Sequence, residues 1–387
     1  MTAAGSGLAV GAEPTAAALD AALEAMAASN ADHADLALVF VAGETYPAAH
    51  EMLHAVRRVT GARVVVGASG AGVLCERREV EGETAVAVLA VRDDRLVATP
   101  FLVPDQAAAG ADVAPVVATQ VGATLAEGGC LLALPDVAGF DPSALLGGLA
   151  AELGHIPIVG ALAAGSPMFE LYGTDAARGA LPGMALSGAR PIIGVAQGCT
   201  PIGEPYIITR AERNVVHEIG SRPALTVLRE AVTASPGGPE RAQRAGIFVG
   251  LAVDPAKSPL ERGDFLVRNL LGADQSSGAL AVGDGVRVGQ TLQFQLRDAA
   301  ASREDLEVTL GRVTRALDGR RPAFGCYFNC AGRGQGLYGV PDHDVALIRQ
   351  HLGAFPLAGF FGNGELAPVG SRNFFHTYTG VLVVFPA

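Results

Sequence analysis

One pattern occurs three times along this chain: an apolar run, a turn, a segment with helical spacing, a second apolar run and a glycine- or alanine-rich turn. The copies extend from Leu36 to Gly72, from Gly129 to Gly165 and from Ala323 to Glu365. Apolar runs that alternate with helical segments are typical of α/β proteins. We therefore expect mixed β-sheets with flanking helices, arranged as two related halves that arose by internal duplication.

Three regions are expected along the sequence. Residues 1–35 form an N-terminal segment, loose over its first dozen residues and helical over Thr15–Ala28, where alanine predominates. Two larger regions cover residues 36–232 and 246–387. The Pro- and Gly-containing stretch within 231–245 is expected to link them.

Local patterns also predict individual elements. Glu83–Val91 and Leu96–Val103 have the composition of strands, and we expect them to pair as a hairpin across the two aspartates between them. In the second region, a strand is expected over Gly246–Ala252. Leucine and valine at helical spacing predict an amphipathic helix over Arg303–Ala316.

The composition limits the partners of the chain. Hydrophobic residues make up 50% and charged residues 17% of it, a balance that favours a large buried core over disorder. The formal net charge of -11 disfavours a general binder of nucleic acid or of anionic membranes. No uninterrupted apolar stretch is long enough for a membrane helix, and no secretory signal is visible.

The cysteines indicate a reducing compartment. Five of them are scattered at positions 75, 130, 199, 326 and 330, without the spacing of a disulfide framework. Cys326 and Cys330 would lie about 13 Å apart on one strand, too far for a disulfide. We therefore expect reduced thiols and a cytoplasmic protein.

A possible metal motif lies in the first copy. His50-Glu51-Met52-Leu53-His54 matches H-E-x-x-H on a predicted helix, where histidines four apart share a face and can bind zinc. The alternative is a solvated helix face, because His50 and His54 lie opposite the apolar stripe of that helix. No third ligand follows at a metalloprotease spacing, so no metal is expected.

The turn Gly67–Gly72 resembles a nucleotide-binding fingerprint only in its glycines. A helix should begin directly after such a fingerprint, and here the chain continues into another strand, so no nucleotide cofactor is expected. The glycines would instead permit positive φ angles and close backbone approach. Ser69 in this turn is either an internal hydrogen-bonding group or a ligand contact.

Polar groups near the C-terminus are the remaining candidates for chemistry. Arg333, in a glycine-rich loop after a strand, can hold a carboxylate with two hydrogen bonds, or it can form a structural ion pair or lie in solvent. Glu365 can receive an ammonium group or pair with Arg333. If Cys330 and His376 meet in space, they could serve as nucleophile and base, although such a histidine is more often structural.

Three segments in this part of the chain resemble the C-terminal signature of the FIST family in order and spacing. They are Cys330-Ala-Gly-Arg333-Gly, Pro356-Leu-Ala-Gly-Phe-Phe-Gly-Asn-Gly-Glu365-Leu-Ala-Pro368 and His376-Thr-Tyr-Thr379-Gly-Val-Leu-Val-Val. Upstream, Val66–Val73 resembles the N-terminal FIST turn. The sequence departs from the family at Val73-Leu74, where an acidic residue is common.

The resemblance implies a sensory module of signal transduction that binds a small ligand such as an amino acid. Arg333 would hold the ligand's carboxylate and Glu365 its ammonium group, while Gly332, Gly334, Asn363 and Ser69 would shape the pocket. Because no output domain is recognised in the sequence, a separate signalling partner is expected. The alternatives are a hydrolase-like enzyme that depends on cysteine or metal, and a scaffold that binds a partner protein.

Overall fold

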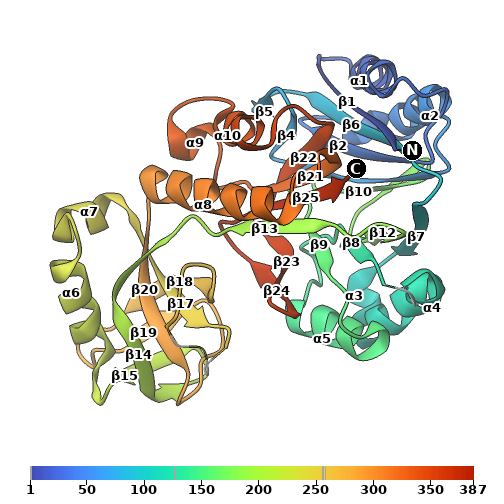
Figure 1. Ribbon diagram of the computed structural model, residues 1–387. Coiled ribbons are helices and arrows are strands. Elements are labelled where there is room, and N and C mark those ends of the chain that lie inside the picture. Colours follow the sequence, from blue (N-terminus) through green and yellow to red (C-terminus); the bar gives the residue numbers. More distant parts are fainter. Residues whose placement is uncertain (1, 126–127, 255–256, 258) are drawn as a thin grey trace. The chain divides into compact units, whose positions relative to one another are not determined.

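The computed structural model describes residues 2–125, 128–254, 257 and 259–387. The chain forms two compact units (Figure 1). The first unit comprises residues 1–195, 308–375 and 379–387, and the second comprises residues 196–307 and 376–378. The second unit is mainly an insertion between residues 195 and 308 of the first, so these units differ from the two consecutive sequence regions expected above.

The first copy builds a six-stranded sheet in the order β1-β6-β2-β3-β10-β11. Its strands are β1 (Ala3–Val10), β2 (Leu36–Ala42), β3 (Val64–Gly70), β6 (Ala85–Arg92), β10 (Glu170–Tyr172) and β11 (Asp175–Ala177). Strands β2 and β3 are parallel, and the 3-10 turn η1 (Tyr46–Ala48) and helix α2 (Ala49–Thr60) connect them.

The N-terminal residues are ordered, contrary to expectation. Strand β1 pairs with β6 along its whole length, and helix α1 (Pro14–Ser29) packs on it. A Cβ atom at Gly5 would lie 2.1 Å from the carbonyl oxygen of Ala25 in that helix. The small residues of both elements therefore permit a close packing that the composition of the segment did not reveal.

The second copy builds a sheet of the same plan, in the order β24-β23-β9-β8-β12-β7. Its strands are β7 (Val97–Val103), β8 (Cys130–Ala133), β9 (Ile158–Ala161), β12 (Leu181–Ser187), β23 (Glu365–Val369) and β24 (Arg372–His376). Its helices are α3 (Gln106–Ala109), η2 (Gly110–Asp112), α4 (Val113–Leu125) and α5 (Pro142–Leu153). The expected hairpin is wrong: β6 pairs within the first sheet and β7 within the second.

The third copy has the order β13-β25-β21-β22-β4-β5. Its strands are β4 (Gly72–Cys75), β5 (Glu79–Glu81), β13 (Ile192–Ala196), β21 (Pro322–Cys330), β22 (Leu357–Gly362) and β25 (Gly380–Pro386). Its helices are α8 (Ala299–Leu317), α9 (Gln335–Tyr338) and α10 (His343–Leu352). The structure thus confirms the expected α/β class, with mixed sheets and flanking helices, and it contains the repeated unit in three copies.

The three copies exchange hairpins in a closed cycle. Each copy sends the two strands that follow its parallel pair into the sheet of another copy. Strands β4 and β5 of the first copy join the third sheet, β10 and β11 of the second copy join the first sheet, and β23 and β24 of the third copy join the second sheet. Each sheet of the first unit is therefore completed by a neighbouring copy.

A ring of backbone hydrogen bonds joins the turns from which these hairpins leave. The carbonyl oxygen of Ser69 accepts from Ala164 N at 2.9 Å, and that of Leu162 accepts from Asn363 N at 3.1 Å. The ring closes where the carbonyl oxygen of Phe361 accepts from Ala71 N at 2.9 Å. The glycine- and alanine-rich turns are therefore the junction of the three copies.

Equivalent glycines mark the three copies. Gly67, Gly160 and Gly359 each face the neighbouring parallel strand, where a Cβ atom would lie 1.7, 1.9 and 1.8 Å from a carbonyl oxygen. The expectation of close backbone approach at Gly67 is confirmed. The expected positive φ angles are not found at Gly67, Gly70 or Gly72, because these three glycines lie in the extended strands β3 and β4.

The core of the first unit lies among the three sheets. Alternate residues of β2, β8 and β21 belong to one buried apolar cluster that includes Phe40, Leu132 and Phe328. Separate clusters fill the spaces between the first sheet and helices α1 and α2, and between the second sheet and helices α4 and α5. Each of these two sheets thus has one face toward the shared core and one face covered by its own helices.

The second unit contains a seven-stranded sheet in the order β14-β20-β17-β18-β19-β15-β16, in which β14 also pairs with β15 and closes the sheet. The strands are β14 (Thr200–Glu212), β15 (Val215–Ile219), β16 (Arg222–Pro223), β17 (Gly246–Ala252), β18 (Phe265–Ala273), β19 (Leu280–Val282) and β20 (Thr291–Arg297). The expected linker is instead largely helical, in α6 (Ala224–Ala234) and α7 (Gly238–Arg244). No helix in the described part of the chain is both long and apolar enough to cross a membrane.

Candidate functional site

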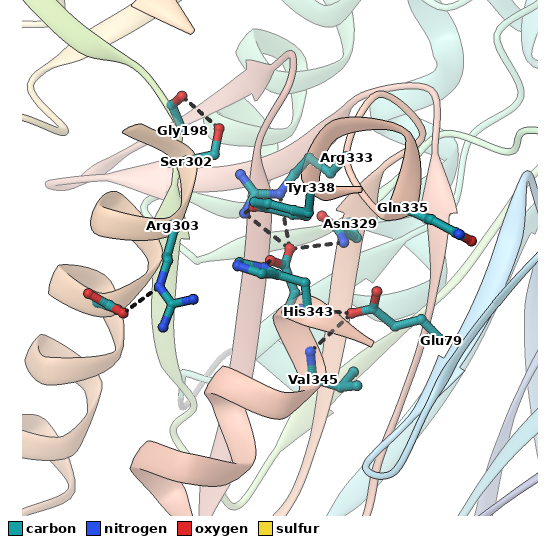
Figure 2. A network of polar contacts seen from close by, with 12 residues as sticks. Glu79, Gly198, Ser302, Arg303, Asn329, Arg333, Gln335, Tyr338, His343 and Val345 are labelled. Atoms are coloured by element: carbon teal, nitrogen blue, oxygen red, sulfur yellow. Dashed lines mark hydrogen bonds and ion pairs between the residues drawn. The ribbon is translucent and has the colours of Figure 1, made fainter. Parts of the chain in front are cut away.

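A buried polar network in the third copy is the strongest candidate for a functional site (Figure 2). Its centre is Asp344, the second residue of α10, whose side chain is 0% exposed. One carboxylate oxygen, Oδ2, accepts hydrogen bonds from Tyr327 Oη at 2.9 Å and Asn329 Nδ2 at 3.1 Å. Strand β21 therefore supplies two donors to one oxygen of the helix residue.

Arg333 supplies the positive charge of the network. Its Nε and Nη2 atoms lie 3.1 and 3.0 Å from Asp344 Oδ2, and the side chain of Arg333 is 0% exposed. Nη2 also donates to Tyr338 Oη at 2.6 Å. The third nitrogen, Nη1, has no hydrogen-bonding partner among the residues that the structure describes. The ion pair of Arg333 is thus with Asp344, and one buried donor group remains available.

Two aromatic side chains cover this ion pair. Tyr338 and His343 are stacked, with ring centroids 3.5 Å apart, and His343 Nδ1 donates to the second oxygen of Asp344 at 2.9 Å. Tyr338 belongs to α9, in the connection 331–342 between β21 and α10, and both aromatic residues are half-buried. This connection separates Arg333 from the surface.

Glu79, from the exchanged strand β5, completes the network. Its Oε1 atom accepts from the backbone N–H groups of Asp344 and Val345 at 3.1 and 3.0 Å, so it caps helix α10 from another copy. Burial, and next the charge of Asp344, raise the pKa of Glu79 to about 8. Oε2 of Glu79 has no partner within the described ranges. The surroundings of this carboxyl group therefore favour its protonated form.

The other ionisable groups respond to the same surroundings. Burial by itself would raise the pKa of Asp344, but the charge of Arg333 and the hydrogen bonds of His343 and Tyr327 outweigh it, and the pKa is held below its usual range. Burial by itself would lower the pKa of Arg333, but the charge of Asp344 outweighs this effect and raises the pKa above its usual range. The buried pair is thus ionised on both sides.

The other two copies show what the fold requires at these positions. In each copy the equivalent glycine of the second parallel strand pairs with one residue of the first strand. This residue is Val39 opposite Gly67, Ala133 opposite Gly160 and Tyr327 opposite Gly359. Tyr327 is therefore the counterpart of Val39 and Ala133. Two residues further along the strand, the counterparts of Asn329 are Val41 and Pro135, which are also buried.

The helices α2, α5 and α10, which connect the parallel strands, also show that the other copies are apolar where the third is polar. Each helix ends at a glycine with positive φ: Gly61, Gly154 or Gly353. Nine positions before these glycines lie buried Met52 and Leu145 in the first two copies, and Asp344 in the third. Two copies thus pack this position with apolar side chains, so the fold itself does not require a buried charge there.

Glu365 occupies a position that the second copy shares. Glu365 pairs with Ala161 of the neighbouring strand, and Glu170 of the second copy pairs in the same way with Ala68. One carboxylate oxygen of Glu365 accepts a hydrogen bond from Thr379 N, and one of Glu170 accepts from Ala180 N. Each of these donors directly precedes the last strand of its copy. In the first copy the corresponding position is Val73, where the sequence departs from the family pattern. Glu365 is fully buried and belongs to this repeated feature of the fold.

The other predicted pocket residues lie at the junction of the copies or in the loop of Arg333. Ser69 is buried: its Oγ donates to Ala164 O and accepts from Phe169 N, so it is an internal hydrogen-bonding group. Asn363 is exposed and donates to Ala163 O. Gly334 has a φ of +69° and leaves no space for a Cβ atom beside the Glu81 carboxylate, whereas Gly332 is exposed.

The structure also places the residues considered for cysteine-dependent and metal-dependent chemistry. Cys330 ends β21 and is 8% exposed, and His376 ends β24 and is 1% exposed. Cys330 belongs to the first unit and His376 to the second. His50 and His54 are exposed on α2, with their Nε2 atoms 3.1 Å apart.

Most members of the network are missing from the sequence prediction, which included only Arg333. A signal for them exists in the sequence. The glycines at the helix end and on the second parallel strand are six residues apart in every copy, as GARVVVG, GHIPIVG and GAFPLAG. Alignment on these glycines places Asp344 in a column with Met52 and Leu145, which marks it as a charged residue at a core position.

Comparisons with known proteins agree with the extent of the resemblance. The model of the FIST N domain matches residues 35–222, and that of the FIST C domain matches residues 224–368. An uncharacterized protein of Mycobacterium tuberculosis (strain ATCC 25618 / H37Rv) is 36% identical over 341 residues, which cover 87% of each chain. One of Mycobacterium bovis (strain ATCC BAA-935 / AF2122/97) is 34% identical over 343 residues, covering 87% of this chain and 86% of the other.

Among solved structures, a cyanuric acid hydrolase from A. caulinodans has a TM-score of 0.29 and 13% sequence identity, over 48% of this chain and 70% of that one. A second cyanuric acid hydrolase structure has a TM-score of 0.33 and 10% identity over the whole of both chains. Likenesses of this size do not bear on the activity of this chain.

Proposed function

The chain belongs to the FIST family, and we propose that it is a sensory protein that binds a small carboxylate, an amino acid in the first place, at Arg333. FIST domains are associated with sensory and signal-transduction proteins. The observation that carries the proposal is the buried Nη1 group of Arg333, which has no partner in the described part of the chain. It belongs to a network of charged and polar side chains where the other copies are apolar.

The chemistry of the network suits a zwitterion. Nη1 can donate to a carboxylate oxygen, and such charge-assisted hydrogen bonds gain strength away from water. Because Arg333 and Asp344 already neutralise each other, a ligand without net charge adds none to the buried site. Its ammonium group needs an acceptor. The sequence indicates Glu365, and Glu79 Oε2 can serve once this carboxyl group gives up its proton, which a nearby positive charge favours.

Entry of the ligand requires movement of the connection 331–342, because Tyr338 and His343 cover Arg333. Gly334 and Gly339 flank α9 and both have positive φ angles, of +69° and +72°. Glycines at the ends of a short helix are suitable hinge positions. We propose that displacement of this connection is the change that a separate signalling partner detects.

A thermal-shift screen of the whole protein against amino acids and small carboxylates tests the proposal. A ligand at about 100 times its Kd should stabilise the folded chain by roughly 2.7 kcal/mol. The variant to compare is the double replacement Arg333→Met with Asp344→Met, which places at position 344 the residue type of its counterpart Met52 and leaves neither partner of the ion pair buried alone. We expect it to fold and to lose the ligand-induced shift.

The controls separate the roles of individual residues. Arg268→Met removes another buried arginine, paired with Asp284 in the second unit, and should leave the shift unchanged. Glu365→Gln and Glu79→Gln distinguish the two acceptors: loss of selectivity for amino acids over simple carboxylates identifies the ammonium site. A shift that persists in the double variant, or no response to any carboxylate, would overturn the proposal.

A further inference from the structure

We propose that His50 and His54 form an open binding site for a divalent transition-metal ion, of the class Zn²⁺, Ni²⁺ or Cu²⁺. The site lies outside the Arg333 network and does not depend on the proposed sensory function. Both residues are on α2, four positions apart and exposed, and their Nε2 atoms lie 3.1 Å apart. The two rings meet edge to face, with centroids 4.4 Å apart.

A backbone contact selects the tautomer of the neutral His50 ring. Its Nδ1 atom lies 2.8 Å from the carbonyl oxygen of Thr174, which can only accept a hydrogen bond. Nδ1 must therefore carry the proton, and Nε2 presents its lone pair. A contact of this kind fixes the tautomer and ring orientation of histidines that bind metals. Without a metal, His54 Nε2–H donates to His50 Nε2.

The distance between the two nitrogens matches shared coordination. Two nitrogens bound to one zinc at about 2.0–2.1 Å in tetrahedral geometry lie about 3.3 Å apart. A metal ion can therefore take the place of the proton between His50 and His54 once the rings turn so that both Nε2 lone pairs converge on it, without a change in the backbone of the helix. Neutral imidazole is a preferred ligand of zinc, copper and nickel.

The remaining coordination positions are open. No group of three or more histidine, cysteine, aspartate or glutamate side chains in the described ranges is arranged to hold a metal. Asp175 Oδ1 lies 3.8 Å from His50, but on the Nδ1 side, so it supports the ring electrostatically rather than as a ligand. The exposed rings leave solvent to complete the coordination, and one turn along the helix Arg58 limits the affinity for a cation.

Occupation of the site would strengthen a junction between two copies. Helix α2 belongs to the first copy, whereas Thr174 lies in the turn between β10 and β11, which the second copy contributes to the first sheet. A metal on Nε2 makes the Nδ1–H group of His50 a stronger donor to Thr174 O. Metal binding should therefore raise the melting temperature of the whole chain.

Isothermal titration of the metal-free protein with Zn²⁺ tests the site. We expect one ion per chain, and a loss of affinity of about tenfold or more in each of His50→Ala and His54→Ala. His351→Ala, which removes an exposed histidine from α10, should leave zinc binding unchanged. Circular dichroism of each variant checks that the fold is retained, as expected for exposed positions.

Spectra with Cu²⁺ provide a second readout. Electron paramagnetic resonance of the copper-loaded protein should show coupling to two nitrogens, reduced to one in His54→Ala. Absence of zinc binding, or undiminished binding in the His50→Ala, His54→Ala double variant, would overturn the proposal. Binding that depends on only one of the two histidines would overturn it as well.

Discussion

A single carboxylate oxygen organises the candidate site. Asp344 Oδ2 receives donors from Tyr327, Asn329 and Arg333, and its negative charge is the counter-ion of a fully buried arginine. Removal of one partner of such a pair leaves the other charge buried without compensation, whereas removal of both does not. Individual side chains in this network therefore have large effects that are not additive.

At this scale we predict that Asp344→Asn lowers the free energy of unfolding by about 3–5 kcal/mol, because Arg333 would stay charged and buried. The double Arg333→Met, Asp344→Met variant should lose less stability than the single Asp344→Asn variant. Urea denaturation followed by circular dichroism measures both. Asp94→Asn, an exposed aspartate of the same unit, is the matched control and should have little effect. A single variant as stable as the wild type would contradict the prediction.

A second buried acid makes stability depend on pH. Burial, and next the charge of Asp136, raise the pKa of Glu170 to about 9, against an ordinary value of 4.5. The folded chain therefore holds a proton that the unfolded chain releases between these two pH values. Stability from this group is complete below about pH 4.5 and falls as the pH rises toward 9.

We accordingly predict that Glu170→Gln, which cannot ionise, reduces the loss of stability between pH 5 and pH 8. Urea unfolding at the two pH values, with Glu44→Gln as an exposed control, measures the difference. Glu79 contributes a loss of the same sign up to about pH 8, so some dependence should remain. An unchanged slope in Glu170→Gln would show that this carboxyl group is ionised in the folded chain.

Among the elements, the parallel strand pairs depend on one glycine each. Gly160 has a φ of +146°, and a Cβ atom there would lie 1.9 Å from the carbonyl oxygen of Ala133. That oxygen belongs to the backbone of the paired strand, so it cannot rotate away as a side chain would. The glycine is required by the close approach of β8 and β9.

Gly160→Ala is predicted to destabilise the chain by about 1–3 kcal/mol or more, the usual cost of overpacking a well-packed core. Gly147→Ala is the control: this residue lies in helix α5 of the same copy, and its Cβ atom would meet no atom within 4 Å. The control should be neutral or stabilising by about 0.5–1 kcal/mol, since alanine favours a helix. Equal melting temperatures for the two variants would contradict this assignment.

At the scale of the whole molecule, the cyclic exchange of hairpins makes the three copies mutually dependent. The first sheet is complete only with β10 and β11 from the second copy, and the hairpin β4–β5 needs the third sheet as its partner. By contrast, the sheet of the second unit consists of strands from residues 200–297 and closes through β14 and β15.

This difference predicts the behaviour of fragments. Residues 2–92, which hold the first copy, should not unfold cooperatively, because their sheet lacks two strands and their hairpin lacks a sheet. Residues 196–307 should show a cooperative transition in urea. Circular dichroism of the two fragments measures this, and a cooperative transition in residues 2–92 would contradict the role given to the exchange.

Patterns within short stretches of the chain predicted many elements correctly. The strand expected over Gly246–Ala252 is β17, and the amphipathic helix expected over Arg303–Ala316 lies within α8, with Leu306, Leu310 and Val313 buried. Both follow from the spacing of apolar residues, a property of neighbouring residues alone. For the same reason the α/β class and the repeated unit could be recognised before the structure.

Pairings between distant residues could not be predicted in this way. Strands β6 and β7 have the pattern of a hairpin but belong to different sheets. The segment of β1 was expected to be loose, and its strand partner, β6, lies far along the sequence. The partner of Arg333 is Asp344, across a connection longer than in the other copies. Local periodicity indicates which residues are buried, but only tertiary packing determines which residues they contact. The sequence therefore determined many of the elements, whereas tertiary packing decided that Arg333 meets Asp344 within the third copy and that the exchanged strand β5 brings Glu79 to the same helix.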